Sequence, residues 1–151
     1  MKKVYQTVHT DLETGIIGNC IQACLASLLE VPLDSLPFFC RMDLYKSHLR
    51  EKHALHVLRF KGYPPRDGKH YIVGYDVKGV KEIGHCVIWR NGRIVHDPKR
   101  PKTHRLTKPH DYYQFVAASK VEEEETVHSI LFGDSSDDQA CSPLRSDRLT
   151  M

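Results

Sequence analysis

The sequence lacks any apolar run of the roughly 18 residues that a membrane-spanning helix needs. Its first residues, Met1 to Gln6, also lack the apolar stretch of a secretory signal peptide. Cysteine is sparse: five in 151 residues are too few for a disulfide framework, and the odd number leaves at least one thiol unpaired. These absences argue against a membrane protein and a disulfide-stapled secreted domain. We expect a cytoplasmic chain with free thiols and no membrane partner.

Neither sign of charge dominates, with 22 Lys and Arg against 19 Asp and Glu. The acidic side chains are unevenly placed, because residues 119–151 carry eight of them and only three basic ones. Such a segment has little apolar surface to bury. We therefore predict one domain over residues 1–118, with a basic excess, followed by an acidic, partly disordered tail over 119–151.

Apolar periodicity separates the domain into a helical part and a strand part. A spacing of three and four predicts a helix that starts near Cys20, with Asn19 as its N-cap, and a second helix over 43–60. The period then changes to two, which predicts strands. The predicted strands cover residues 71–75, 86–89, 93–96 and 112–117. This order predicts an α+β fold in which N-terminal helices pack on a small antiparallel sheet.

Cys20 is the best candidate for a catalytic group. A thiol at a helix start faces the free backbone N–H groups of the first turn and the positive end of the helix dipole. Both favour the thiolate, and the same N–H groups can receive the oxyanion of a tetrahedral intermediate. We predict no catalytic role for the remaining cysteines. Cys24, Cys40 and Cys86 are predicted core residues, and Cys141 is incidental in the tail.

A nucleophilic thiol needs a base, and His85 is distinguished from the other histidines by its position. It follows Gly84 at the start of an apolar strand, where its side chain can project from the sheet edge into a cleft. Asp97 closes the next predicted strand and is suited to orient the imidazole. The three residue types together form a nucleophile, a base and an orienting carboxylate.

The hairpin register decides whether His85 and Asp97 can meet. The dipeptide Asn91-Gly92 indicates a turn but allows two loops. A two-residue loop would point His85 and Asp97 to opposite faces, whereas a three-residue loop would pair them directly. We favour the three-residue loop, which also keeps two arginines from lying directly opposite each other.

The sequence also resembles a known group of enzymes. The pattern Gly-x-Cys-x-x-Ala-Cys-x-Ala-Ser-Leu-Leu, then Val-Pro, Leu-Pro-Phe, Gly-His-x-Val and His-Asp-Pro, is similar to papain-like cysteine peptidases over roughly residues 4–118. More narrowly, it resembles bacteriocin-processing peptidases and small, mostly uncharacterised phage and bacterial proteins. The resemblance implies a papain-like fold with Cys20 as nucleophile, His85 as base and Asp97 as orienting residue.

The same families hold an oxyanion-hole glutamine upstream of the cysteine. Gln6 is the only glutamine before Cys20, but it lies fourteen residues away, farther than is usual in those families. The insertion at residues 11–15 would have to loop out for Gln6 to reach the thiol. Asn19 and backbone N–H groups are the alternatives for this role.

The expected function is a cysteine-dependent hydrolase that cleaves a peptide or amide bond of a peptide or protein substrate through a thioester, with no cofactor. Amine transfer and deamidation would use the same residues. The alternative is a catalytically inactive papain-fold protein that acts through protein–protein contacts, for example in counter-defence.

Two other classes have weaker support. A zinc site could draw on Cys20, Cys24 and His85, but no second element carries a pair with ligand spacing. A basic cluster at residues 99–105 could contact nucleic acid, but it has no interleaved aromatic residues and no recognition helix. We expect neither a metal nor a nucleic-acid partner.

Overall fold

The computed structural model describes residues 1–11, 13–78, 84–100 and 105–120, which form a mixed helix and sheet fold. Along the chain the elements are α1 (Cys20–Leu29), the 3-10 helices η1 (Leu33–Ser35) and η2 (Met42–Leu44), α2 (Tyr45–His53), β1 (Leu55–Lys61), β2 (Tyr71–Val77), β3 (Gly84–Arg90), β4 (Arg93–His96) and β5 (Leu106–Ala117). The predicted α+β class is confirmed.

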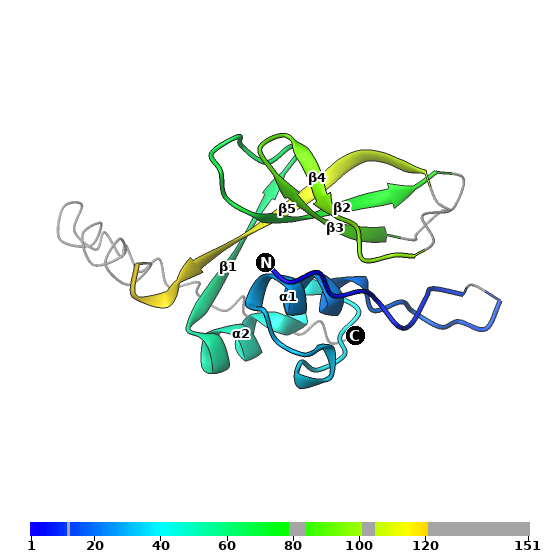
Figure 1. Cartoon of the computed structure of the whole chain (residues 1–151), viewed down its shortest axis with the longest axis horizontal. Coiled ribbons are helices and arrows are strands. Elements are labelled where there is room, and N and C mark those ends of the chain that lie inside the picture. The colour runs from blue at the N-terminus through cyan, green and yellow to red at the C-terminus, as the bar shows by residue number, and fades with distance from the viewer. Residues whose placement is uncertain (12, 79–83, 101–104, 121–151) are drawn as a thin grey trace, which may run out of the picture.

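The strands form one antiparallel sheet in the order β1-β5-β2-β3-β4. The long strand β5 joins the two halves, because it pairs with β1 at one edge and with β2 in the middle. Figure 1 shows the helices together on one side of this sheet, with α1 beneath β3. The molecule therefore has two layers, and the contact between α1 and β3 lies between them.

The main core fills the space between these layers. Buried side chains of α1, including Cys24 and Leu25, pack with Cys86 and Ile88 of β3. Neighbouring β3 residues alternate across the sheet, so Val87 joins a second, smaller cluster on the other face. The start of β3 is thereby fixed relative to the start of α1.

The predicted second helix over 43–60 is wrong in its second half. α2 ends at His53, because Ala54 takes a left-handed conformation (φ 50°), and residues 55–61 form the edge strand β1. Leu44 and Leu58, two of the apolar positions that suggested the longer helix, are 51% and 38% exposed. Pairing with β5 decided this segment, and such pairing is not visible in a local pattern.

The predicted three-residue loop between β3 and β4 is also wrong. Arg90 pairs with Arg93 across a two-residue turn in which Asn91 and Gly92 both have positive φ angles, 50° and 81°. An irregularity follows, because Trp89 pairs with Ile94 but Ile88 pairs with His96. Val95 is thus one extra residue, and this bulge shifts the register by one.

No helix in the described ranges is both long and apolar enough to cross a membrane. The predicted tail and Cys141 lie outside the described residues, except for positions 119 and 120.

Candidate active site

Cys20 is the first residue of α1, and its partly exposed side chain lines a cleft. Asn19 stands at the N-cap position without a side-chain cap bond. Among the described residues, no hydrogen bond uses the backbone N–H of Cys20 or Ile21. The thiol therefore lies at a helix start whose donors are free to face an anion.

The surroundings of Cys20 favour its thiolate. A side-chain hydrogen bond from Cys86 has the largest effect on the pKa of Cys20 and lowers it. Burial acts in the opposite direction, but a hydrogen bond and the charge of His85 lower the pKa further. The pKa of Cys20 is consequently held well below that of an ordinary cysteine.

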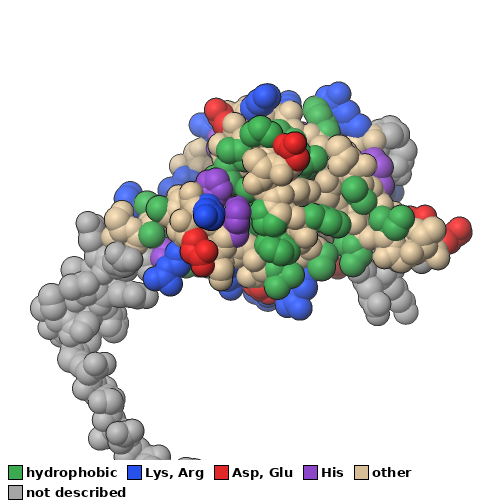
Figure 2. All heavy atoms as spheres, turned by 90° about the horizontal axis from the view of Figure 1, so that it is seen from below, with side chains coloured by type: hydrophobic (Ala, Val, Ile, Leu, Met, Phe, Trp, Pro, Cys, Tyr) green, Lys and Arg blue, Asp and Glu red, His purple; other side chains and the backbone are tan. Residues whose placement is uncertain are grey.

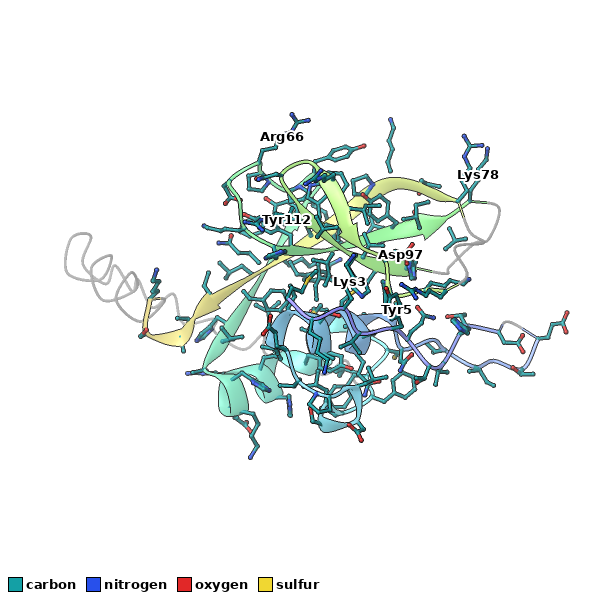
Figure 3. The ribbon with its side chains drawn as sticks, viewed as in Figure 1. Lys3, Tyr5, Arg66, Lys78, Asp97 and Tyr112 are labelled. Carbon is teal, nitrogen blue, oxygen red and sulfur yellow. The ribbon has the colours of Figure 1, made fainter. Side chains whose placement is uncertain are left out.

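His85 and Asp97 lie together, as the sequence predicted, although the register is different. The distance from His85 Nε2 to Asp97 Oδ1 is 2.8 Å, and both side chains are buried. Asp97 Oδ1 also accepts the backbone N–H of Lys99 at 3.0 Å, which fixes the carboxylate. Figure 3 shows Asp97 just after β4, between the sheet and the layer that holds α1 and Tyr5.

The bulge explains how a two-residue turn still brings these side chains together. Since His96 pairs with Ile88, the shifted register sets the next residue, Asp97, in the same alternation as His85. In a regular ladder without the bulge, Val95 would pair with Ile88 and Asp97 with Cys86, on the opposite side from His85. His96 is buried, and its Nε2 lies 2.7 Å from the carbonyl oxygen of Val4.

The imidazole of His85 is poised to carry a positive charge. Burial lowers the pKa of His85, but hydrogen bonds with Asp97 and Cys20 outweigh that effect and raise it to about 9. A depressed thiol pKa and a raised imidazole pKa describe a thiolate–imidazolium pair at neutral pH. This charge state is the one a cysteine nucleophile requires.

The cleft beside Cys20 has a volume of about 560 Å³. His85 and Cys86 form part of one wall, and Ile16 and Ile17 stand exposed on another. Cys40 and Met42, the first residue of η2, also line the cleft. The volume is in the range of small-molecule and cofactor binding sites.

The insertion before Cys20 loops out, as Gln6 would require. Asp11 N donates to Ile16 O at 2.9 Å, so the chain doubles back. Gln6 Nε2, however, lies 3.1 Å from Val8 O and 2.8 Å from His9 Nδ1. Both amide hydrogens of Gln6 are thus engaged, and the structure gives this side chain no spare donor for an oxyanion.

Asn19 has a structural role. Its side-chain oxygen accepts the N–H groups of Thr7 and Val8 at 3.1 and 3.0 Å. Its amide nitrogen donates to Thr7 Oγ1 and to Gln22 Oε1. Asn19 therefore ties the N-terminal segment to α1, and both of these amide hydrogen bonds stay within the protein.

The other described cysteines divide into two groups. Cys24 and Cys86 are buried, which confirms the core prediction. Cys40 is exposed and lines the cleft, so the core prediction for it is wrong. The neighbouring apolar residue Phe38 is itself 52% exposed, and its hydrophobicity therefore gave a false signal.

Sequence reasoning missed a buried carboxylate in the cleft wall. Asp111 of β5 is 2.6 Å from Arg59 Nη2 and 2.8 Å from Lys61 Nζ, both on β1. Asp111 also contacts His110 Nδ1 at 3.0 Å. Asp111 directly precedes the predicted strand over 112–117 and follows polar residues, so no local signal marked it, and its partners depend on the unrecognised strand β1.

The described part of the chain adds no evidence for the zinc site or for the nucleic-acid contact considered above. It holds no group of three or more His, Cys, Asp or Glu side chains placed to bind a metal. Of the basic cluster, Arg100 lies over the Tyr5 ring, 3.7 Å from its centroid, and contacts the Tyr5 hydroxyl. Figure 2 shows hydrophobic side chains near the middle of the helix-side face and charges of both signs around them. This face presents no basic stripe.

Comparisons of the chain with protein-family models, with curated proteins and with solved structures found no match.

Proposed function

We propose that the protein is a cysteine-dependent hydrolase of peptide or amide bonds, with Cys20 as nucleophile, His85 as acid–base and Asp97 as orienting residue. One observation carries this proposal: a thiol at a helix start interacts with an imidazole whose Nε2 lies 2.8 Å from a buried carboxylate. The resemblance to papain-like peptidases agrees with this assignment.

The proposed reaction begins with the thiolate of Cys20, which attacks the carbonyl carbon of the substrate. The carbonyl oxygen becomes an oxyanion, and the free N–H groups at the start of α1 are placed to stabilise it. The C–N bond then breaks as the leaving amine takes a proton from the His85 imidazolium. Cys20 is left as a thioester, which water attacks with His85 now acting as the base.

Asp97 contributes by fixing the imidazole. Because Nε2 faces the carboxylate, Nδ1 is the nitrogen available for proton exchange with Cys20 and the leaving group. Contacts from His85 and from the backbone N–H of Lys99 help to hold the carboxylate itself. His85 therefore has little freedom to rotate, which preorganises the proton transfer.

The cleft favours a peptide substrate over a small polar amide. Its exposed isoleucines, Ile16 and Ile17, offer apolar contacts, while the charged groups Arg59 and Asp111 already pair with each other. An extended segment with an apolar side chain next to the scissile bond would fit these walls.

Labelling with iodoacetamide at neutral pH tests the proposal. We expect Cys20 to react at least about tenfold faster than Cys40, an exposed thiol that lines the same cleft, because Cys20 is ionised at this pH. Mass spectrometry of the labelled peptides distinguishes the two sites. The variant His85→Ala should remove the advantage of Cys20, since it removes the imidazolium.

Cleavage of a peptide library provides the second test. Cys20→Ala should abolish cleavage and leave the circular dichroism spectrum unchanged, because a partly exposed thiol adds little packing. A chain whose Cys20 reacts no faster than Cys40, and whose wild type cleaves nothing, would instead be a binding protein built on this fold.

A further inference from the structure

Three thiols converge where α1 packs on β3. Cys20 and Cys24 are one turn apart on the helix, and Cys24 Sγ lies 3.5 Å from the carbonyl oxygen of Cys86. Cys20 and Cys86 both line the cleft and share the main core. In the hydrolytic mechanism bonds form and break only at the Cys20 sulfur, and Cys86 contributes no more than a hydrogen bond to it.

The two cleft thiols differ in chemical character. The Cys86 side chain is hydrogen-bonded to Cys20, and this contact, together with burial, raises the pKa of Cys86 well above its ordinary value. Cys20 is therefore the reactive thiolate and Cys86 the protonated neighbour. A thiolate reacts first with an oxidant, and a thiol beside it can then resolve the product.

We propose that Cys86 is the resolving cysteine of a redox pair, which forms a reversible disulfide with Cys20 and switches the site off in the presence of a peroxide. The role of the disulfide as an off-switch for catalysis rests on the proposed hydrolase function. Formation of the disulfide itself requires only the two thiols. Blocking Cys20 as a disulfide would also protect it from irreversible oxidation.

Hydrogen peroxide is the only reagent that formation of this disulfide requires. The Cys20 thiolate attacks one oxygen of hydrogen peroxide, the O–O bond breaks, and the departing hydroxide takes a proton from His85 to give water. Cys20 is then a sulfenic acid. The Cys86 sulfur attacks the Cys20 sulfur, its proton passes through His85 to the leaving hydroxide, and a second water forms with the S–S bond. The two sulfurs lose two electrons, and the peroxide gains them.

Helix geometry points to Cys86 over Cys24 as the partner. Side chains four residues apart on a helix have Cβ atoms about 5–6 Å apart, whereas a disulfide needs a Cβ separation of about 3.5–4.5 Å. Cys24 also directs its thiol at the Cys86 carbonyl. Cys40, an exposed thiol that also lines the cleft, is the competing partner, but it is not among the residues of the core cluster that holds Cys20 and Cys86.

The test treats the full chain with a small excess of hydrogen peroxide and maps its peptides under non-reducing conditions. We expect a Cys20–Cys86 disulfide, loss of Cys20 labelling by iodoacetamide, and full recovery after dithiothreitol. The variant Cys40→Ser should give the same disulfide. A Cys20–Cys40 disulfide, or a wild type that accumulates sulfenic acid without any disulfide, would overturn the proposal.

The variant Cys86→Ala gives a second readout, the fate of oxidised Cys20. In this variant a dimedone probe should trap Cys20 sulfenic acid in roughly tenfold greater yield than in the wild type, because nothing resolves it. Equal yields would contradict the pairing. A chain that forms the disulfide but cleaves no peptide would refute the hydrolase and leave the redox pair standing, and cleavage without the disulfide would do the reverse.

Discussion

At the scale of single residues, Asp97 acts on Cys20 through His85. Its carboxylate raises the pKa of the imidazole, and the imidazolium in turn stabilises the thiolate. Cys86 acts on the same thiolate from the other side through its hydrogen bond. The reactivity of one sulfur thus depends on groups from α1, β3 and the residue after β4.

Asp97→Asn should reduce kcat/KM by more than about tenfold, because the amide cannot stabilise the charged imidazole. The pKa of His85 is raised to about 9, so activity that needs the imidazolium falls as the pH rises through that value. In the variant this pKa drops, and the alkaline limb of the profile of kcat/KM against pH should move to lower pH. Asp34→Asn, which changes an exposed carboxylate, serves as the control and should match the wild type. An unmoved alkaline limb in Asp97→Asn would contradict the role assigned to Asp97.

Asp111 is a second carboxylate whose ionisation matters, in this case for stability. Burial alone would raise the pKa of Asp111, but hydrogen bonds from Arg59, Lys61 and His110 outweigh it and hold the pKa well below the ordinary 3.8. A depressed carboxylate pKa stabilises the fold above the unfolded value, and that stability is lost as the pH falls further.

Asp111→Asn should therefore lower the free energy of unfolding at pH 7 by roughly 1–3 kcal/mol. The difference from the wild type should shrink below about pH 4, where the unfolded carboxyl is protonated. Urea unfolding at several pH values measures both effects. Asp76→Asn provides a comparison, because the Asp76 side chain is 71% exposed. A pH-independent difference would show that packing, not charge, is what Asp111 supplies.

At the scale of elements, the hairpin of β3 and β4 sets the side on which Asp97 falls. In a regular ladder after the turn at Asn91-Gly92, Asp97 would pair with Cys86 and point away from His85, and the bulge at Val95 shifts the pairing by one residue. Bulges are often found beside active sites for this reason, since one inserted residue redirects the side chains that follow.

Deletion of Val95 should leave the triad assembled. The ladder would become regular while Ile88 still pairs with His96, so Asp97 stays on the side of His85. Deleting Ile94 and Val95 together would bring Asp97 opposite Ile88 and point it to the wrong face. Iodoacetamide labelling of Cys20 should therefore remain fast in the single deletion and fall to the rate of Cys40 in the double deletion. The reverse order would refute the role of the bulge.

At the scale of the whole molecule, β5 holds the two halves of the sheet together. It pairs along its length with β1 and with β2, and β1 follows directly from the helical layer. Loss of its last residues would leave β1 without a partner, because Leu55 pairs with Ala117.

A chain that ends at Lys120 should fold, since β5 and both core clusters lie before that point. A chain that ends at Asp111 should not, because it loses most of the pairing between β1 and β5. Thermal unfolding followed by circular dichroism compares the two. Aggregation of the chain that ends at Lys120 would mean that residues 121–151 contribute to the folded state.

The sequence by itself determined the features that depend on near neighbours. Periodicity predicts the start of α1 at Cys20 and the strands around residues 71–75 and 86–89. The turn residues predict that His85 and Asp97 lie on either side of one hairpin turn. Cys24 and Cys86 could likewise be assigned to the core from their apolar surroundings.

Only the tertiary structure decided the features that depend on distant partners. Residues 55–61 form a strand because they pair with β5. The bulge at Val95 lies where β4 contacts both β3 and the core. Tertiary contacts also decide that the side-chain amides of Gln6 and Asn19 are engaged in hydrogen bonds. They likewise bring Cys86 next to Cys20. Strand pairing and side-chain hydrogen bonds join residues far apart in the chain, and a local sequence pattern carries no record of such partners.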